Sequence, residues 1–284
     1  MRSGDKTDFR REATILTKLS DSKHAHDHLV TLLATYEHDG VYHLIFPWAE
    51  LDLFDFWRQR TPEVEEMGTW VVDQCLGLAA GLNSVHRYAT LSGAILNYGS
   101  DPPVRKAVGR QKQFGPVENT SPTRVMRNLF GRHGDLKPEN ILWYPDDMTP
   151  GGHGILKITD FGVARFSTEN SWDTRRTGRM PNSETYRSPE MELDGVLTSA
   201  CDVWALGCVY LQFITWYLGG CKLVERFGQR RLASDPFMAD IPSDTFFSIY
   251  FEAGVKRAKV KSAVIEVSLL SQLSVLNSLR YGAY

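Results

Sequence analysis

The stretch HGDLKPENIL at residues 133–142, followed by TDFGVAR at 159–165, decides the fold of this chain. Together the two stretches contain a carboxylate at Asp135, a cation at Lys137, an amide at Asn140 and a second carboxylate at Asp160. Transfer of a phosphoryl group from ATP needs a carboxylate at the acceptor hydroxyl, a cation near the developing charge and oxygen ligands for magnesium. The four side chains supply each of these groups, so the sequence predicts a site for this chemistry.

Each of the four residues has an expected role in that site. Asp135 is suited to orient the acceptor hydroxyl and accept its proton, and Lys137 to stabilise the transferred phosphoryl oxygens. Asn140 and Asp160 are the expected magnesium ligands, because magnesium is a hard cation that prefers oxygen. Phe161 and Gly162 follow Asp160 and indicate a sharp backbone turn beside an apolar anchor.

The composition is that of an ordinary globular protein. The chain has 284 residues, of which 42% are hydrophobic and 23% charged. Its net charge of −2 argues against a general nucleic-acid partner. The four cysteines show no paired spacing, and the polar start is not a signal peptide. We therefore expect an intracellular protein, cytoplasmic or nuclear, with no membrane partner; the composition does not indicate an oligomeric state.

The hydrophobic pattern predicts a mixed set of elements. Helices are expected at 8–19, 51–60, 69–87 and 203–218, with further apolar helical segments at 242–254 and 264–279. Strands are expected at 29–36, 41–46, 141–144 and 155–158, the first two joined by a turn at Asp39-Gly40. Residues 88–130 read as an irregular insertion, with a basic partner-binding segment as the alternative, and 166–182 as a surface segment.

The uncharged stretch 203–221 is also about long enough to span a membrane. Hydropathy alone leaves the choice between a membrane helix and a buried core helix open.

These motifs resemble the catalytic loop and the Asp-Phe-Gly segment of the eukaryotic protein kinase family. SPE at 188–190 and DVWALGC at 202–208 follow them in the order that the family shows. Four ordered matches make a chance arrangement improbable, whereas a lone DFG would be weak. The place of Asp202 in this order also favours a buried core helix over a membrane span.

The resemblance implies an α+β, two-lobed protein-kinase-like fold with an incomplete N-lobe sheet and a mainly helical C-lobe. A single kinase-like domain would cover 1–284. Residues 1–47 would form a partial N-lobe with the αC helix and two or more strands, and 48–284 the C-lobe. The implied activity is ATP- and Mg²⁺-dependent transfer to a Ser or Thr of a protein substrate; Lys137 and SETYRSPE at 183–190 favour this type over a tyrosine kinase.

The resemblance also assigns an ATP site. Glu12 is similar to the αC glutamate, and Phe46 to the gatekeeper. Pro47 to Ala49 would present backbone groups to adenine, and Leu142 would lie under its ring. Ser183 matches the residue that contacts the catalytic Asp and Lys.

Some of these residues also have simpler interpretations. HAHDH at 24–28 is more readily a solvated loop than a metal site, because no Cys or carboxylate cluster accompanies it. His133 is expected to pack beneath the catalytic loop rather than act as an acid or base. Glu12 taken alone would be an ordinary surface acid of a helix.

The chain departs from the family at three places. Gly134 replaces the usual Arg that pairs with a phosphate on the activation segment, so we expect activity that does not depend on such phosphorylation. Only eleven residues precede Glu12; none forms GxGxxG, and Lys6 is too close to be the strand lysine. No clear late arginine is available for Glu190, and Arg280 is a weak candidate. The alternatives are therefore a shortened kinase and a pseudokinase or scaffold that binds partners without catalysis.

Overall fold

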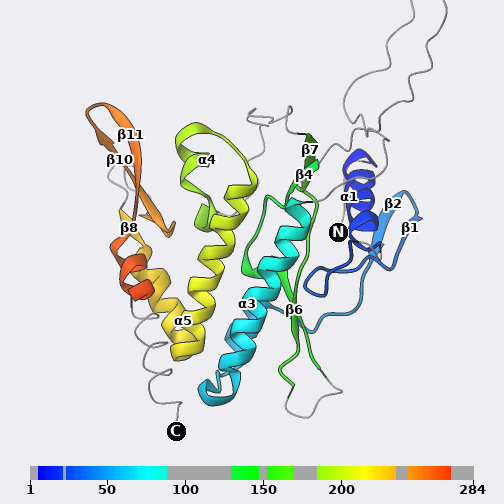
Figure 1. Cartoon of the computed structure of the whole chain (residues 1–284), viewed down its shortest axis with the longest axis horizontal. Helices are drawn as coiled ribbons and strands as arrows, with labels where there is room; N and C mark the ends of the chain where they lie inside the picture. Colours follow the sequence, from blue (N-terminus) through cyan, green and yellow to red (C-terminus); the bar gives the residue numbers. More distant parts are fainter. Residues whose placement is uncertain are drawn as a thin grey trace, which may run out of the picture.

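The computed structural model describes residues 6–21, 24–87, 129–146, 152–168, 184–234 and 242–269. A small lobe contains α1 (Lys6–Leu19), β1 (Ala34–His38) and β2 (Val41–Ile45). The larger lobe is built around α3 (Val64–His86) and α5 (Ser199–Arg231), which run side by side through the middle of the molecule. Figure 1 shows the small lobe on one side of this helix pair and the hairpin of β10 (Phe247–Glu252) and β11 (Val255–Val260) on the other.

The small-lobe sheet has two strands among the described residues. β1 and β2 are antiparallel, and Asp39 and Gly40 join them with φ of +49° and +73°. Positive φ at both positions is what a two-residue hairpin turn requires, so the predicted turn is observed. All five residues of β1 are exposed, and α1 contacts the sheet through Phe9, which stacks on Tyr42 at 4.6 Å. The prediction of an incomplete N-lobe sheet is confirmed.

The helical core of the large lobe follows the predicted apolar periodicity. α2 (Leu53–Gln59) begins at Asp52, whose side chain accepts the N–H of Asp55. α5 begins at Thr198, whose hydroxyl accepts the N–H of Ala200. It extends past the predicted end, although the backbone leaves helical geometry at Gly219 and Gly220.

By length and composition α5 resembles a membrane span. However, its Phe213 and Trp216 are fully buried, and the Trp216 indole N–H donates to the Trp57 carbonyl at 3.1 Å. These contacts make it a core helix.

Two small sheets flank the helix pair. The first has the strand order β3 (Leu51–Asp52), β5 (Ile141–Tyr144), β6 (Ile155–Ile158), and the last two strands have the predicted bounds. The second pairs β4 (Leu129–Arg132) with β7 (Arg165–Thr168).

This pairing corrects the two loop predictions at their edges. Leu129 and Phe130 are strand residues, as are 166–168, because each segment finds its hydrogen-bonding partner in the other. Residues 88–128 and 169–182 lie outside the described residues.

The helix predicted at 242–254 is wrong. These residues form β9 (Pro242–Ser243), which pairs with β8 (Ala233–Ser234), and then β10. Phe247 and Ile249 are buried, whereas Ser248 and Tyr250 are only half-buried, so the period is two rather than 3.6. Ala253 and Gly254, with φ of +50° and +79°, make the turn into β11. Residues 262–269 are helical as predicted, and the rest of the 264–279 segment lies outside the described residues.

The loop at 24–28 joins the two lobes. His28 approaches α3 so closely that a Cβ added at Gly77 would lie 1.9 Å from its Nε2. Its Nδ1 lies 2.8 Å from the Leu156 carbonyl, and the Val30 N–H donates to Ile158 in β6. The described part of the chain holds no group of three or more His, Cys, Asp or Glu placed to bind a metal. The contacts of His28 show that this loop packs against α3 and β6, and the expectation that HAHDH is not a metal site stays a prediction.

The division of 1–284 into a partial N-lobe and a C-lobe within one domain stays a prediction.

Candidate active site

The catalytic loop is held in place by one buried carboxylate. Asp202, 2% exposed at the start of α5, accepts the backbone N–H of His133 and of Gly134, each at 2.8 Å. Its Oδ2 also lies 2.9 Å from Nε2 of His86 at the end of α3. A buried carboxylate is stable when hydrogen bonds replace its water, and these three partners do so. The two central helices thus fix the start of the loop.

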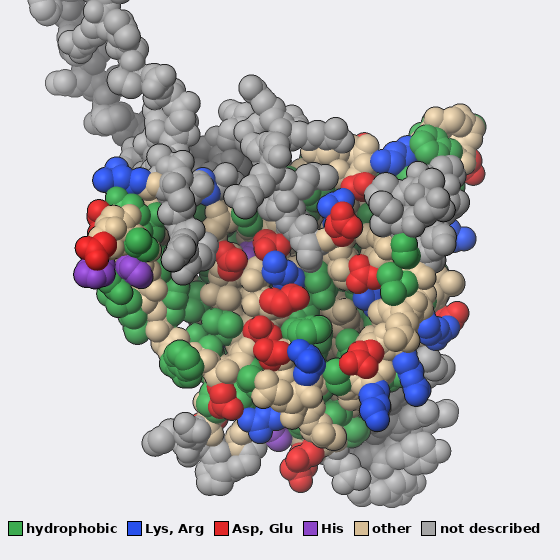
Figure 2. Space-filling view, turned by 180° about the vertical axis from the view of Figure 1, so that it is seen from behind, with side chains coloured by type: hydrophobic (Ala, Val, Ile, Leu, Met, Phe, Trp, Pro, Cys, Tyr) green, Lys and Arg blue, Asp and Glu red, His purple; other side chains and the backbone are tan. Residues whose placement is uncertain are grey.

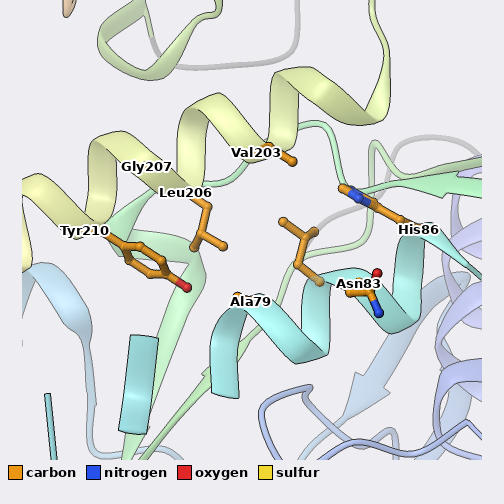
Figure 3. Close-up of a pocket in the computed structure, with 8 residues that line it drawn as sticks. Ala79, Asn83, His86, Val203, Leu206, Gly207 and Tyr210 are labelled. Carbon is orange, nitrogen blue, oxygen red and sulfur yellow. The ribbon is translucent and has the colours of Figure 1, made fainter. Parts of the chain in front are cut away.

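His86 also lines a groove between the two helices (Figure 3). Ala79, Asn83 and His86 of α3 face Val203, Leu206 and Tyr210 of α5 across a cavity of about 320 Å³. The Tyr210 hydroxyl donates to the Cys75 carbonyl, and burial raises the pKa of Tyr210 and that of the Cys75 thiol, the latter to about 12. The Tyr210 hydroxyl and the Cys75 thiol stay protonated at neutral pH, and the bond from Tyr210 to Cys75 ties α5 to α3 beside the groove.

His133 has the structural role that the sequence predicts. It is fully buried, and its ring meets Phe161 edge-on with centroids 5.0 Å apart. Nδ1 accepts the Asp135 N–H at 3.2 Å, and Nε2 lies 2.8 Å from the Thr159 carbonyl. These partners are satisfied by a neutral imidazole protonated at Nε2, assigned from the contacts. His133 therefore ties the catalytic loop to the Asp-Phe-Gly segment.

The structure brings Asp135, Lys137 and Asn140 together. Nζ of Lys137 lies 3.0 Å from Oδ2 of Asp135. The Asn140 amide donates to the same oxygen at 3.1 Å and to the Asp135 carbonyl at 2.8 Å. Asn140 belongs to a 3₁₀ turn, Pro138–Asn140, whose proline starts the turn without needing an N–H. A carboxylate, a cation and an amide of one short loop are thus in contact with one another.

Asp160 stands beside this cluster in a strained conformation. Its φ is +61°, which is rare for a residue with a Cβ, and its Oδ1 accepts the Gly162 N–H at 3.2 Å. The preceding Thr159 N–H donates to the Asn140 carbonyl, and the following Phe161 is fully buried. These contacts hold Asp160 at the turn, directly after a residue whose backbone is hydrogen-bonded to Asn140.

α1 reaches this segment through a residue that the sequence analysis missed. Arg11 donates from Nη2 to the Gly162 carbonyl at 2.8 Å. Its neighbour Glu12, a predicted site residue, is buried on the same helix. The only sequence signal for Arg11 is its position next to Glu12. The structure thus connects the small lobe to the Asp-Phe-Gly segment.

The predicted adenine-contacting residues lie at the junction of the lobes. Phe46 is partly buried against the core, and Pro47 and Ala49 follow in the link between β2 and β3. Leu142 in β5 pairs with Asp52, and the Tyr144 hydroxyl donates to the Pro47 carbonyl at 3.4 Å. The structure therefore places the link and the strand of Leu142 side by side.

The segment after 183 packs against the middle of α5. It consists of a 3₁₀ turn, Glu184–Tyr186, and α4 (Pro189–Asp194). The Tyr186 hydroxyl donates to Gln212 at 2.7 Å, and burial together with nearby Glu139 raises the pKa of Tyr186. Ser183 and Arg280 lie outside the described residues.

The face seen in Figure 2 carries both signs of charge. Asp and Glu side chains alternate with Lys and Arg over its middle, with apolar side chains between them, rather than forming one basic surface. The expectation of no nucleic-acid partner stays a prediction.

Comparison with known proteins gives a consistent assignment. Residues 128–218 match the family model described as a protein kinase domain. A cyclin-dependent kinase E-1 of Arabidopsis thaliana is 27% identical over 81% of this chain and 38% of its own length. A probable cyclin-dependent kinase 9 of Schizosaccharomyces pombe is 36% identical over 43% of this chain and 22% of its own length.

A serine/threonine-protein kinase PDK1 of Cryptococcus neoformans is 42% identical over 29% of this chain and 6% of its own length. The chain thus spans less than half the length of each of these relatives. The matched family model includes the loop at 133–140, Asp160 and the start of α5, which are the parts that the geometry joins. Residues 128–218 are therefore similar to the protein kinase domain, and the relatives named here are protein kinases.

Proposed function

We propose that this chain transfers the γ-phosphoryl group of ATP to a serine or threonine hydroxyl of a protein. The observation that carries the proposal is the convergence of Asp135, Lys137 and Asn140, with Lys137 Nζ 3.0 Å from the Asp135 carboxylate. Phosphoryl transfer depends mainly on positioning and charge, and the loop that holds these groups is anchored from both sides by Asp202 and His133.

Each residue has a distinct task in this reaction. Asp135 orients the acceptor hydroxyl and accepts its proton. Lys137 stabilises negative charge on the transferred oxygens, and in the resting protein it neutralises Asp135. Asn140 keeps Asp135 in position through its amide hydrogens.

Asn140 and Asp160 suit a magnesium ion because each can offer it an oxygen atom. The Asn140 amide nitrogen is engaged with Asp135, so its oxygen is the atom that a metal would take. Asp160 uses Oδ1 for the Gly162 N–H, which leaves Oδ2 as an anionic ligand. When bound, magnesium would neutralise charge on the phosphates. Protein kinases use ATP and magnesium in general; binding by this chain is part of the proposal.

ATP would lie between the lobes. Pro47 to Ala49 would offer backbone groups to adenine, Phe46 would close the rear, and Leu142 would lie beneath the ring. Glu12 on α1 would face the phosphate side. The segment at 184–190 would receive the protein substrate, and the compartment would be intracellular, cytoplasmic or nuclear.

A scaffold that binds partners without catalysis is the second candidate. It is favoured by the two-stranded small-lobe sheet of the described residues, where all of β1 is exposed. A protein with this role would need the fold but not the cluster at Asp135, Lys137 and Asn140.

One set of measurements distinguishes the kinase function from the scaffold function. Thermal unfolding is followed with and without millimolar Mg-ATP, and phosphotransfer to dephosphorylated casein is assayed with labelled ATP. A ligand that binds only the folded state raises the melting temperature. The kinase proposal expects a rise and phosphotransfer in the wild type. Asp135→Asn should keep the rise and lose transfer by at least roughly a hundredfold, the lower range for a general base.

Asp160→Asn should reduce the magnesium-dependent part of the rise, because it removes an anionic ligand. The matched control is Asp194→Asn, an exposed carboxylate at the end of α4, which should behave as wild type. No rise in the wild type would contradict catalysis by this chain. A rise without phosphotransfer, unchanged in Asp135→Asn, would support the scaffold.

A further inference from the structure

Arg231, at the end of α5, is nearly fully buried, with 1% of its surface exposed. Asp202 at the other end of the same element anchors the catalytic loop. Burial of a guanidinium costs free energy unless the protein replaces its water. The contacts that Arg231 makes therefore define a second anchoring point of α5.

Two aromatic rings and one backbone carbonyl surround Arg231. Its guanidinium carbon lies 4.2 Å from the ring centroid of Phe227 and 4.1 Å from that of Phe246. Nε donates to the Asp244 carbonyl at 3.0 Å. Lys261 closes the site by donating from Nζ to the Arg231 carbonyl at 2.8 Å and to the Ser243 carbonyl at 2.7 Å. Residues 243–246 are thus fixed against the end of α5.

Asp244 connects residues 243–246 to another segment of the chain. Its Oδ1 accepts the hydroxyl hydrogen of Thr185 at 2.7 Å. Thr185 lies in the 3₁₀ turn Glu184–Tyr186, immediately before α4. The neighbouring Tyr186 also faces this site, with its ring centroid 6.4 Å from that of Phe246. A side-chain hydrogen bond and a ring contact therefore hold the turn to residues 244–246.

The anchor comes from a part of the chain outside the family-model match. That match ends at residue 218, whereas Arg231, Asp244 and Lys261 all follow it. The sequence contains no clear late arginine to pair with Glu190. The structure instead fastens the turn at Thr185, three residues before Ser188, through its hydrogen bond to Asp244.

We propose that Asp244 is a positioning residue for the protein substrate, and that it acts by holding Thr185 and thereby the turn at 184–186. The proposal rests on the proposed kinase function, in which this turn receives the protein substrate. The turn packs on α5 through the bond from Tyr186 to Gln212, and the start of the same helix anchors the catalytic loop through Asp202. A displaced turn presents the acceptor hydroxyl poorly to Asp135, while the ATP side of the site is unaffected.

The first test is kinetic and uses the full chain with dephosphorylated casein. Thr185→Val removes the donor and keeps the shape, Asp244→Ala removes the acceptor, and Thr185→Ser restores a hydroxyl. Loss of one hydrogen bond corresponds to roughly a three- to tenfold change, and we expect this rise in KM for casein in the first two variants. KM for ATP should stay within about twofold, and Thr185→Ser should return KM for casein towards the wild-type value.

The double variant Thr185→Val/Asp244→Ala should be no worse than the worse single variant, because both changes break the same contact. The matched control is Thr215→Val, which removes a buried hydroxyl bonded only within α5, to the Leu211 carbonyl. It should leave KM for casein unchanged even if it lowers the melting temperature.

The second test does not require activity. Amide hydrogen exchange of peptides covering 184–190 should be roughly three- to tenfold faster in Thr185→Val than in the wild type and Thr215→Val. If the wild type transfers no phosphate, the proposed function fails, and faster exchange still supports the anchor. Unchanged exchange in Thr185→Val, additive effects in the double variant, or an equal rise in KM for ATP would overturn the role of Asp244.

Discussion

The small-lobe sheet and the α3–α5 pair differ in how much of their apolar surface they bury. In the small lobe, Leu33, Tyr36 and Ile45 are exposed large hydrophobic residues of the β1–β2 region. In the helix pair, Phe213 and Trp216 are completely buried and hydrogen-bonded partners surround the start of α5. The side of the site that would bind magnesium and the acceptor hydroxyl is therefore built on the well-packed lobe.

This difference indicates where the stability of the site originates. Asp135, Lys137 and Asn140 lie on a loop whose anchors, Asp202 and His133, are buried in the large lobe. α1 contacts this region through Arg11, which donates a hydrogen bond to the Gly162 carbonyl. We therefore expect changes in the large lobe to alter global stability and changes in β1–β2 to have small effects.

The largest expected effect is that of Asp202→Ala. It leaves two buried backbone N–H groups, of His133 and Gly134, without their acceptor. Removing one partner of a buried charged network costs roughly 3–5 kcal/mol. We expect a loss of this size in the free energy of unfolding, to be measured by urea unfolding. The comparison variant is Asp39→Asn in the exposed β1–β2 turn, where asparagine tolerates the positive φ.

Asp39→Asn should change the free energy of unfolding by less than about 0.5 kcal/mol. Similar losses in the two variants would contradict the contrast between the lobes.

Gly77→Ala should cause the next largest loss in the free energy of unfolding. It tests the junction between the lobes. The new Cβ would lie 1.9 Å from His28 Nε2, so His28 must move and lose its bond to the Leu156 carbonyl. Overpacking costs about 1–3 kcal/mol, partly offset by the better helix propensity of alanine. We expect the free energy of unfolding, measured in urea, to fall by about 1–2 kcal/mol. An increase would show that the loop at 24–28 can move away from α3 at little cost.

Gly134→Ala should cost about 1 kcal/mol for a different reason. Gly134 has φ of +88°, and a Cβ there would meet nothing closer than Val163 at 3.5 Å. The cost is therefore conformational rather than steric, because L residues rarely adopt this backbone angle. Gly134→Arg should pay a similar penalty, so restoring the family's usual residue should not stabilise this chain. A stabilised Gly134→Arg variant would contradict this explanation.

Gly207→Ala should raise the free energy of unfolding, unlike the substitutions above. This glycine lies inside α5, and an added Cβ would meet nothing within 4 Å because it faces the groove of Figure 3. The change should stabilise the protein by about 0.5–1 kcal/mol through helix propensity alone. A loss on thermal or urea unfolding would mean that the groove is filled in solution.

Much of the fold was predictable because its periodicity is strong. β5 and β6 have the predicted bounds, and the Asp39-Gly40 turn follows from its dipeptide. The hairpin at 247–260 was not predicted. Phe246, Phe247, Ile249 and Phe251 form an apolar run that fits either period, and only the burial of alternate residues decides between them.

The candidate site was predictable where one short segment carries the chemistry. Asp135, Lys137 and Asn140 are within six residues of each other, and the structure brings them into contact. Arg11, His86 and Asp244 were missed because each acts across a large sequence separation. Such pairs have no local pattern, since only the packing of α1, α3 and the segment after α5 brings them to their partners.

The smallest expected effect is a pH dependence at the lobe junction. Burial against α3 lowers the pKa of His28 below its ordinary value near 6.5; the neighbouring His26 and Lys157 act in the same direction, whereas Asp27 and the Leu156 carbonyl oppose them. The unfolded chain therefore takes up a proton at higher pH than the folded protein. Stability from this group is present above pH 6.5 and is lost as the pH falls from there towards the folded pKa.

His28→Asn keeps an N–H that can reach the Leu156 carbonyl but removes the titrating ring. The melting temperature of the wild type should therefore fall more steeply than that of His28→Asn between pH 6.5 and 5, while the two slopes agree above pH 7. Parallel slopes throughout would mean that His28 takes up its proton without leaving α3. The contact between His28 and α3 at Gly77 would then be loose enough to admit the protonated ring.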